Sequence, residues 1–188
     1  MRKSPLLLAL AVIPGFAVAA AEPAPVSIGA LLTQTAGEWS GQLQYRDYQS
    51  NQWEGLPVKV RIAVQPDGVT MIRTAEFDDG PQTGLVWITS ISQFDAAGRS
   101  ESYAQFRKGR AVDSGTATLA MPSAARDPQH WTIVATQTRR DGNGMAQVRE
   151  TTTRDGANMV TLKEVNPLDD GKDEWLPRNR LVLQQIAQ

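Results

Sequence analysis

The feature that most constrains this chain is an alternation of apolar and polar side chains that begins at Trp39 and recurs in segment after segment. In residues 39–46 one face carries Trp, Gly, Leu and Tyr, and the other carries Ser, Gln, Gln and Arg. Residues 58–64 repeat the pattern with valine and isoleucine on every second position. A period of two is typical of a β-strand with one buried and one solvent-facing side.

Short turn sequences separate these segments at even spacing. Four of them contain an Asp-Gly pair, at 67–68, 79–80, 141–142 and 155–156, and such pairs favour tight turns between antiparallel strands. The sequence therefore predicts an all-β fold, an antiparallel up-and-down barrel of about 9–10 strands. Closing the meander into a barrel removes exposed sheet edges. A short helix starting after Ser27, with Ile28, Leu31 and Leu32 on one side, is expected to cover one mouth.

The first residues have the features of an export signal. Arg2 and Lys3 precede an apolar stretch, and small residues with an Ala-x-Ala pattern follow it, so residues 1–21 are predicted to be a cleaved signal peptide. Residues 22–26 form a proline-containing linker, and residues 27–188 form one barrel domain. We expect a periplasmic or secreted protein without a lipid anchor on cysteine, and without a transmembrane segment, because the apolar stretch is short and broken by proline and glycine.

Composition narrows the chemistry. The chain has no cysteine, which excludes disulfides, zinc–thiolate sites, iron–sulfur clusters and cysteine nucleophiles. Its 19 Lys and Arg residues nearly balance its 20 Asp and Glu residues, for a formal net charge of −1. This balance does not favour nucleic acid or an anionic membrane as a partner. We expect no cofactor and no metal site, and the pattern sets no oligomeric state.

Gly37-Glu38-Trp39, which follows the predicted helix and opens the first strand, resembles the opening motif of lipocalin-like (calycin) barrels. In that family the tryptophan plugs the closed end, and an arginine from the last strand lies across its ring. The resemblance implies this role for Arg180, or alternatively Arg178, and a cup able to hold a small ligand. The chain lacks a Thr-Asp-Tyr turn motif, a disulfide and a C-terminal helix, and so is more similar to small bacterial calycin-like secreted proteins than to classical lipocalins.

Charged residues interrupt the apolar faces of several predicted strands. Arg73 shares a face with Met71 and Phe77, while Glu150 and Glu164 share faces with valines and a leucine. Two interpretations follow. The charges point inward into a polar or hydrated cavity, or they lie near the wet ends of their strands.

Two functions are consistent with this pattern. The first is an exported binding protein that holds a small apolar or amphipathic ligand inside the barrel, with these lining candidates: Met71, Arg73, Trp87, Tyr103 and Phe106. The second is an envelope-associated interaction or structural protein that acts through its outer surface, with Tyr45, Tyr48 and Trp53 as exposed aromatics. An enzyme is not predicted, because no nucleophile motif or metal cluster is visible.

Two further features receive a structural interpretation. His130, the single histidine, starts a predicted strand beside Asp127, and we expect it to face solvent rather than to bind haem or act in catalysis. The acidic run 169–174 lacks the ligand spacing of a calcium loop and contains Lys172, so we expect a solvated loop.

Overall fold

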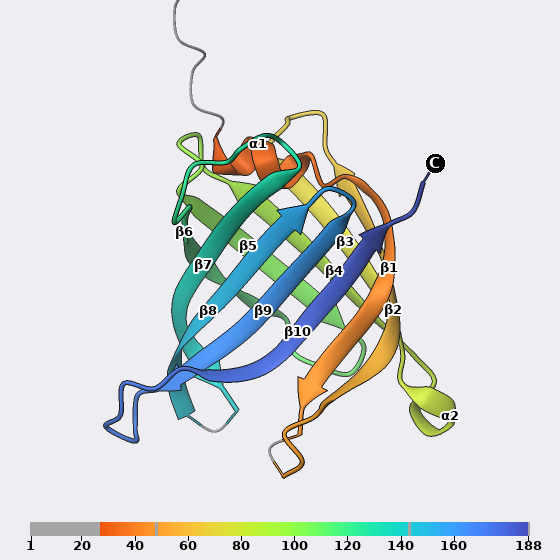
Figure 1. The fold of residues 1–188 in the computed structure, drawn as a ribbon, viewed down its shortest axis with the longest axis vertical. Helices are drawn as coiled ribbons and strands as arrows, with labels where there is room; N and C mark the ends of the chain where they lie inside the picture. Colours follow the sequence, from red (N-terminus) through yellow and green to blue (C-terminus); the bar gives the residue numbers. More distant parts are fainter. Residues whose placement is uncertain (1–26, 48, 143, 188) are drawn as a thin grey trace, which may run out of the picture.

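The computed structural model describes residues 27–47, 49–142 and 144–187. They form a closed barrel of ten antiparallel strands, with one short helix, α1 (Ile28–Thr33), lying across one end (Figure 1). The predicted signal peptide 1–21, the linker 22–26 and Tyr48 lie outside the described residues. The strands are β1 (Gly37–Arg46), β2 (Trp53–Val64), β3 (Thr70–Asp78), β4 (Leu85–Phe94), β5 (Ser100–Arg107), β6 (Asp113–Ala120), β7 (His130–Asp141), β8 (Gly144–Asp155), β9 (Asn158–Pro167) and β10 (Leu176–Gln185).

Every strand pairs with its neighbours in the sequence, and β1 pairs with β10 to close the ring. The predicted fold class, an up-and-down antiparallel barrel with an N-terminal helix, is therefore confirmed, and the strand number is ten. A four-residue helical turn, α2 (Gly80–Thr83), occupies the loop that was predicted as a plain turn. Ser27 caps the N-terminus of helix α1, and its hydroxyl accepts a hydrogen bond from the Ala30 N–H at 3.2 Å, as expected for an N-cap.

The apolar core fills the end of the barrel that α1 covers. Leu31 of the helix and Trp39 of β1 are fully buried there, and inward-facing residues of the other strands complete the cluster. The Trp39 indole N–H donates to the Thr35 carbonyl oxygen at 2.9 Å, so the polar atom of this ring is satisfied inside the core. The core thus closes one end of the barrel, in agreement with the expected position of the tryptophan and the helix.

The arginine over Trp39 comes from an unexpected strand. Arg180 lies over the ring of Trp53, with its guanidinium carbon 4.4 Å from the ring centroid. The prediction that Arg180 lies over Trp39 is therefore wrong. Arg154 of β8 lies over Trp39 instead, at 5.6 Å. It is only 4% exposed and donates to the carbonyl oxygens of Gln34 and Gly156 at 2.9 and 3.2 Å. Arg180 faces outward because it is paired with Gln44, on the solvent side of β1.

Gly41 allows β1 and β10 to approach each other where the ring closes. A Cβ atom at this position would lie 1.9 Å from the carbonyl oxygen of Val182, which is far inside contact distance and involves backbone on the other side. Gly41 is paired with Leu183 in the register of these two strands. A side chain of any size therefore conflicts with ring closure.

We predict that Gly41→Ala lowers the free energy of unfolding by about 1–3 kcal/mol, because the added methyl group must push β10 away from β1. Urea denaturation followed by tryptophan fluorescence measures this loss. Gly55→Ala is the matched control, since a Cβ there meets only the flexible side chains of Gln42 and Gln44. Equal stability of the two variants would contradict the role of Gly41.

A second prediction concerns Arg154. Arg154→Met is expected to cost about 1–3 kcal/mol of stability, because it leaves two part-buried carbonyl oxygens without their donors and removes the contact with the Trp39 ring. Arg61→Met, an exposed arginine on the outer wall, is the control and should stay within about 0.5 kcal/mol of the unsubstituted protein. If the two arginine variants unfolded at the same urea concentration, Arg154 would not hold the closed end together.

Candidate functional site

The register of the strands decides which side chains face the lumen. Trp39 faces inward, and stepwise pairing around the ring places Val60, Ala75 and Ile88 on the same side of the wall. Continuing around the ring puts Arg73, Tyr103, Glu150 and Lys163 on inward positions as well. These four polar residues are only partly exposed. The lumen below the apolar core is therefore polar.

Arg73 is the most unusual of these residues. Arg73 projects from β3, and its cross-strand neighbour on β2 is the buried Ile62. Burial lowers the pKa of its guanidinium. The negative charge of Glu150 acts in the opposite direction, although β8 lies on the opposite side of the ring from β3. Among the described residues, Arg73 forms no ion pair and no hydrogen bond through its side chain. Arg73 is partly exposed inside the barrel, so its guanidinium is free to donate hydrogen bonds to an anionic group, which marks this position as a candidate site.

Two carboxylates share this layer with Arg73. Burial raises the pKa of Glu101, an effect that Ser92 reduces through a hydrogen-bonding interaction and that the charge of Glu150 reinforces. Ser92 is buried and is the cross-strand neighbour of both Met71 and Tyr103. The middle of the lumen thus contains one guanidinium, two carboxyl groups and hydroxyl groups, contributed by β3, β4, β5 and β8.

A polar wall continues from this layer toward the open end. The Tyr103 hydroxyl donates to Gln137 Oε1 at 2.9 Å, reaching past β6 at Gly115, where an added Cβ would lie 3.1 Å from the tyrosine oxygen. Arg139 donates to Asp113 at 2.8 Å, while its Nε is buried and has no hydrogen-bond partner in the described part of the chain. These side-chain contacts span the seam between β6 and β7, whose backbones pair only over Thr118–Ala120.

The opposite wall of the open half is apolar. Its inward residues come from β1, β2, β4 and β10, are partly buried and pack against the edge of the core: Leu43, Leu56, Val86, Ile88 and Leu181. The open half of the barrel therefore presents an apolar wall on one side and a charged, hydrogen-bonding wall on the other. An amphipathic molecule matches such a surface.

The structure brings three of the five predicted lining residues to the interior and places two outside. Arg73 and Tyr103 face the lumen. Met71 faces inward at the closed end, where it is the cross-strand neighbour of Ser92. The prediction that Trp87 and Phe106 line the lumen is wrong, because both point outward and are 54% and 44% exposed. Both faces of β4 are apolar, so alternation alone does not identify the inner face of this strand.

The charged residues for which the sequence allowed two interpretations are also found on both sides of the wall. Arg73 and Glu150 face inward, whereas Glu164 faces outward and binds Arg149 Nε at 2.9 Å. Arg149 also stacks on Trp175, with 4.1 Å between the guanidinium carbon and the ring centroid. Trp53 and Trp175 border the two long loops at the open end, and each lies under an arginine of the outer wall. These loops are thereby held to the barrel by cation–π contacts.

His130 and the acidic loop have local partners. The two ring nitrogens of His130 contact Asp127 at 2.7 Å and Asp155 at 3.3 Å, and its side chain is 30% exposed. In the loop, Asp173 accepts a hydrogen bond from Asn166 at 2.9 Å, and Asp170 accepts one from the Lys172 N–H. Within the described residues, no group of three or more histidine and carboxylate ligands is placed to hold a metal ion.

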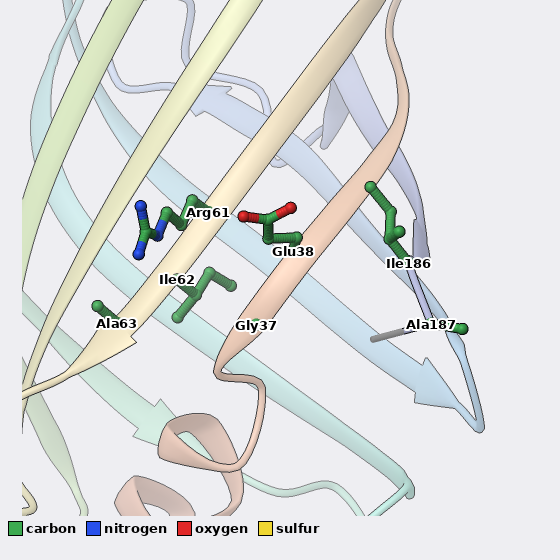
Figure 2. A pocket seen from close by; sticks show the side chains of 7 residues that line it. All are labelled: Gly37, Glu38, Arg61, Ile62, Ala63, Ile186 and Ala187. Atoms are coloured by element: carbon green, nitrogen blue, oxygen red, sulfur yellow. The ribbon is translucent and has the colours of Figure 1, made fainter.

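A depression of about 490 Å³ lies on the outer surface, beside the closed end of the barrel. Figure 2 shows its lining on neighbouring strands, with Glu38 of β1 beside Arg61 of β2 and with Ile186 and Ala187 after β10. Glu38 and Arg61 are register partners on the solvent face of these strands. The depression is separate from the lumen and has only these two charged groups, so it is a weaker candidate than the interior.

The fold and the interior together define the molecule as a closed ten-strand antiparallel barrel with a charged lumen, an architecture compatible with a binding protein. No protein-family model matches the chain, and no characterised protein is significantly similar to it in sequence. No helix in the described ranges is long and apolar enough to cross a membrane.

The raised pKa of Glu101 leads to a prediction about pH. The Glu101 carboxyl holds its proton more tightly in the folded state than in the unfolded state. The free energy of unfolding therefore falls as pH rises from the pKa of Glu101 in the unfolded chain to its higher pKa in the folded protein. Glu101→Gln should therefore be more stable than the unsubstituted protein at neutral pH, and this advantage should vanish near pH 4, about the pKa of an unfolded glutamate. Urea midpoints measured at several pH values test this. Glu38→Gln on the outer wall is the control, and the same pH trend in both variants would contradict the assignment.

Proposed function

We propose that this protein binds a small amphipathic molecule in the barrel lumen, with an anionic or strongly hydrogen-bond-accepting group at Arg73 and an apolar part along the inward-facing apolar residues of the neighbouring strands β2 and β4. The observation that carries this proposal is the inward-facing, partly exposed Arg73 guanidinium, which has no ion pair or side-chain hydrogen bond to any described residue. A carboxylate, phosphate or sulfonate would supply the acceptors that this cation lacks.

Several other features support the same function. The buried Arg139 Nε is a second donor without a partner among the described residues, and it lies on the polar wall of the open half. The apolar wall, which includes Leu43, Leu56 and Ile88, is only partly covered and offers contact surface for a chain or ring. The resemblance of Gly37-Glu38-Trp39 to the lipocalin-like motif, and the location of Trp39 at the closed end, agree with a cup of calycin type.

Export is part of this proposal. The basic start, the apolar stretch and the Ala-x-Ala sites in residues 1–21 support a signal peptide and hence a periplasmic or secreted carrier. Native mass spectrometry of protein purified from the periplasm reads out both points at once, since it reports the mass of the mature chain and that of any molecule that co-purifies with it.

The binding test uses a fluorescent fatty acid, dansyl-undecanoic acid, and its uncharged methyl ester as paired probes. Arg73→Met should weaken binding of the acid by about tenfold to a hundredfold, the loss expected for a charge-assisted hydrogen bond. Binding of the ester should change little. Phe106→Ser, on the outer wall, is the control that excludes probe bound to the outside.

The ligand-free stability of Arg73→Met provides an independent measurement. Replacing this inward-facing charge, which has no ion pair among the described residues, with a similarly sized apolar side chain should leave the free energy of unfolding unchanged or raise it. A variant that is stable but binds the acid poorly would identify Arg73 as a binding residue. If the folded, unsubstituted protein bound neither probe and carried no ligand when purified, lumen binding would be ruled out.

A second candidate function is recognition through the outer wall. The outward orientation of Trp87 and Phe106 favours it, because large exposed aromatics gathered on one face are characteristic of interaction surfaces.

A further inference from the structure

The outer face of strands β3, β4 and β5 carries an apolar patch, here called the β4 patch. In one cross-strand row of this patch, Ile72 of β3 lies beside Ile91 of β4, which lies beside Ala104 of β5. In the next row Thr89 lies beside Phe106, and Trp87 and then Leu85 follow on the outer face of β4. Leu85, Trp87, Ile91 and Phe106 are 39–56% exposed. The outer faces of β7 and β8, in contrast, are mostly polar and include five threonines. The apolar side chains are therefore concentrated on one wall, the far wall in Figure 1.

Charges of opposite sign border the two sides of this patch. On the β3 side, Asp78 is the register partner of Leu85, and Asp79 follows. Glu76, the partner of Trp87, also lies 3.9 Å from Lys59 of β2, so the edge is acidic mainly through Asp78 and Asp79. On the β5 side, Lys108 comes directly after Arg107, the last residue paired with β4, and Arg110 follows it. Asp78, Asp79, Lys108 and Arg110 are exposed. The patch thus has an acidic edge and a basic edge separated by the width of β4.

This arrangement complements itself under two-fold symmetry. If two copies pack patch to patch about an axis parallel to β4, then β4 faces β4, and β3 of one copy lies over β5 of the other. The acidic edge of each copy then faces the basic edge of its partner, at both sides of the contact, and Trp87 lies opposite Trp87. An anionic membrane surface would attract Lys108 and Arg110 but repel Glu76, Asp78 and Asp79 beside the same apolar residues, so it fits less well.

We propose that the β4 patch is the interface of a homodimer with its two-fold axis parallel to β4. Burial of Trp87 and Phe106 provides the apolar centre of this interface, and the two acidic–basic edge contacts fix its orientation. Arg73 faces the inside of the barrel and lies outside the contact, although the loops that carry Asp79, Lys108 and Arg110 are at the open end. Loss of the Arg73 side chain should therefore leave dimerisation unchanged.

Sedimentation velocity across micromolar protein concentrations tests the proposal. The unsubstituted protein should shift from monomer to dimer, and Trp87→Ser should raise the dissociation constant at least about tenfold, as expected for an aromatic residue at the centre of an interface. Met145→Ser is the matched control, because Met145 is 45% exposed on the outer face of β8. Arg73→Met should dimerise normally, which separates this test from that of ligand binding.

A charge-reversal experiment tests the orientation. One variant combines Asp78→Lys with Asp79→Lys, and another combines Lys108→Glu with Arg110→Glu. Each variant alone should be monomeric, because like charges would then face each other, whereas an equimolar mixture should recover a dimer. All four positions are exposed, so the fold should tolerate these changes.

Any one of the following results would overturn the proposal. The first is a protein that stays monomeric at every concentration. The second is a dimer that Trp87→Ser leaves intact, or one that the charge-reversed mixture fails to restore. The third is a monomer that binds phosphatidylglycerol vesicles through Trp87, which would assign the patch to a lipid surface.

Discussion

The pairing of β1 with β10 is the constraint on which the rest of the structure depends. Neighbouring strands pair wherever a meander folds, but the ring exists only if the first strand also finds the last. Gly41 permits the close approach at this junction, and Gln185 continues the pairing as far as Trp39. Once the ring is closed, the alternation along each strand becomes a division between inside and outside. The same junction therefore determines both which charges enter the lumen and which aromatic side chains remain in solvent.

Closure also explains why the two halves of the interior differ. At the end covered by α1, Trp39, Trp131 and Leu31 fill the cross-section, and the single buried cation, Arg154, has its hydrogen bonds satisfied by backbone carbonyls. Other inward positions carry Arg73, Glu101 and Glu150, for which apolar residues would give a more stable core. Proteins keep such groups where function requires them, at a cost in stability. The contrast between Arg154, which donates to backbone carbonyls, and Arg73, which has no such partner among the described residues, supports the proposal that Arg73 binds a ligand.

Much of the fold follows from the sequence, because period-two alternation and Asp-Gly turns are local signals. They predicted the barrel, the helix with its Ser27 cap and the inward position of Trp39. The identity of the arginine over Trp39 was not predictable, because contacts across the ring depend on the stagger of strands far apart in the chain. Trp87 was assigned to the wrong face since β4 is apolar on both sides. Phe106 lies three residues from Tyr103 on the same strand, so an odd spacing already indicated that only one of the two lines the lumen.

The misassigned aromatics carry information of their own. A strand with two apolar faces is expected in a sheet that is covered on both sides, whereas a barrel in isolation covers only the inner one. In β4, Val86 and Ile88 face the lumen, while Leu85, Trp87 and Ile91 face outward and are 39–56% exposed in the described part of the chain. The sequence of β4 is thus that of a strand between two layers, and the single chain supplies one. The opposite charges at the two edges of this strand show what the second layer must present, and another copy of the same wall presents it.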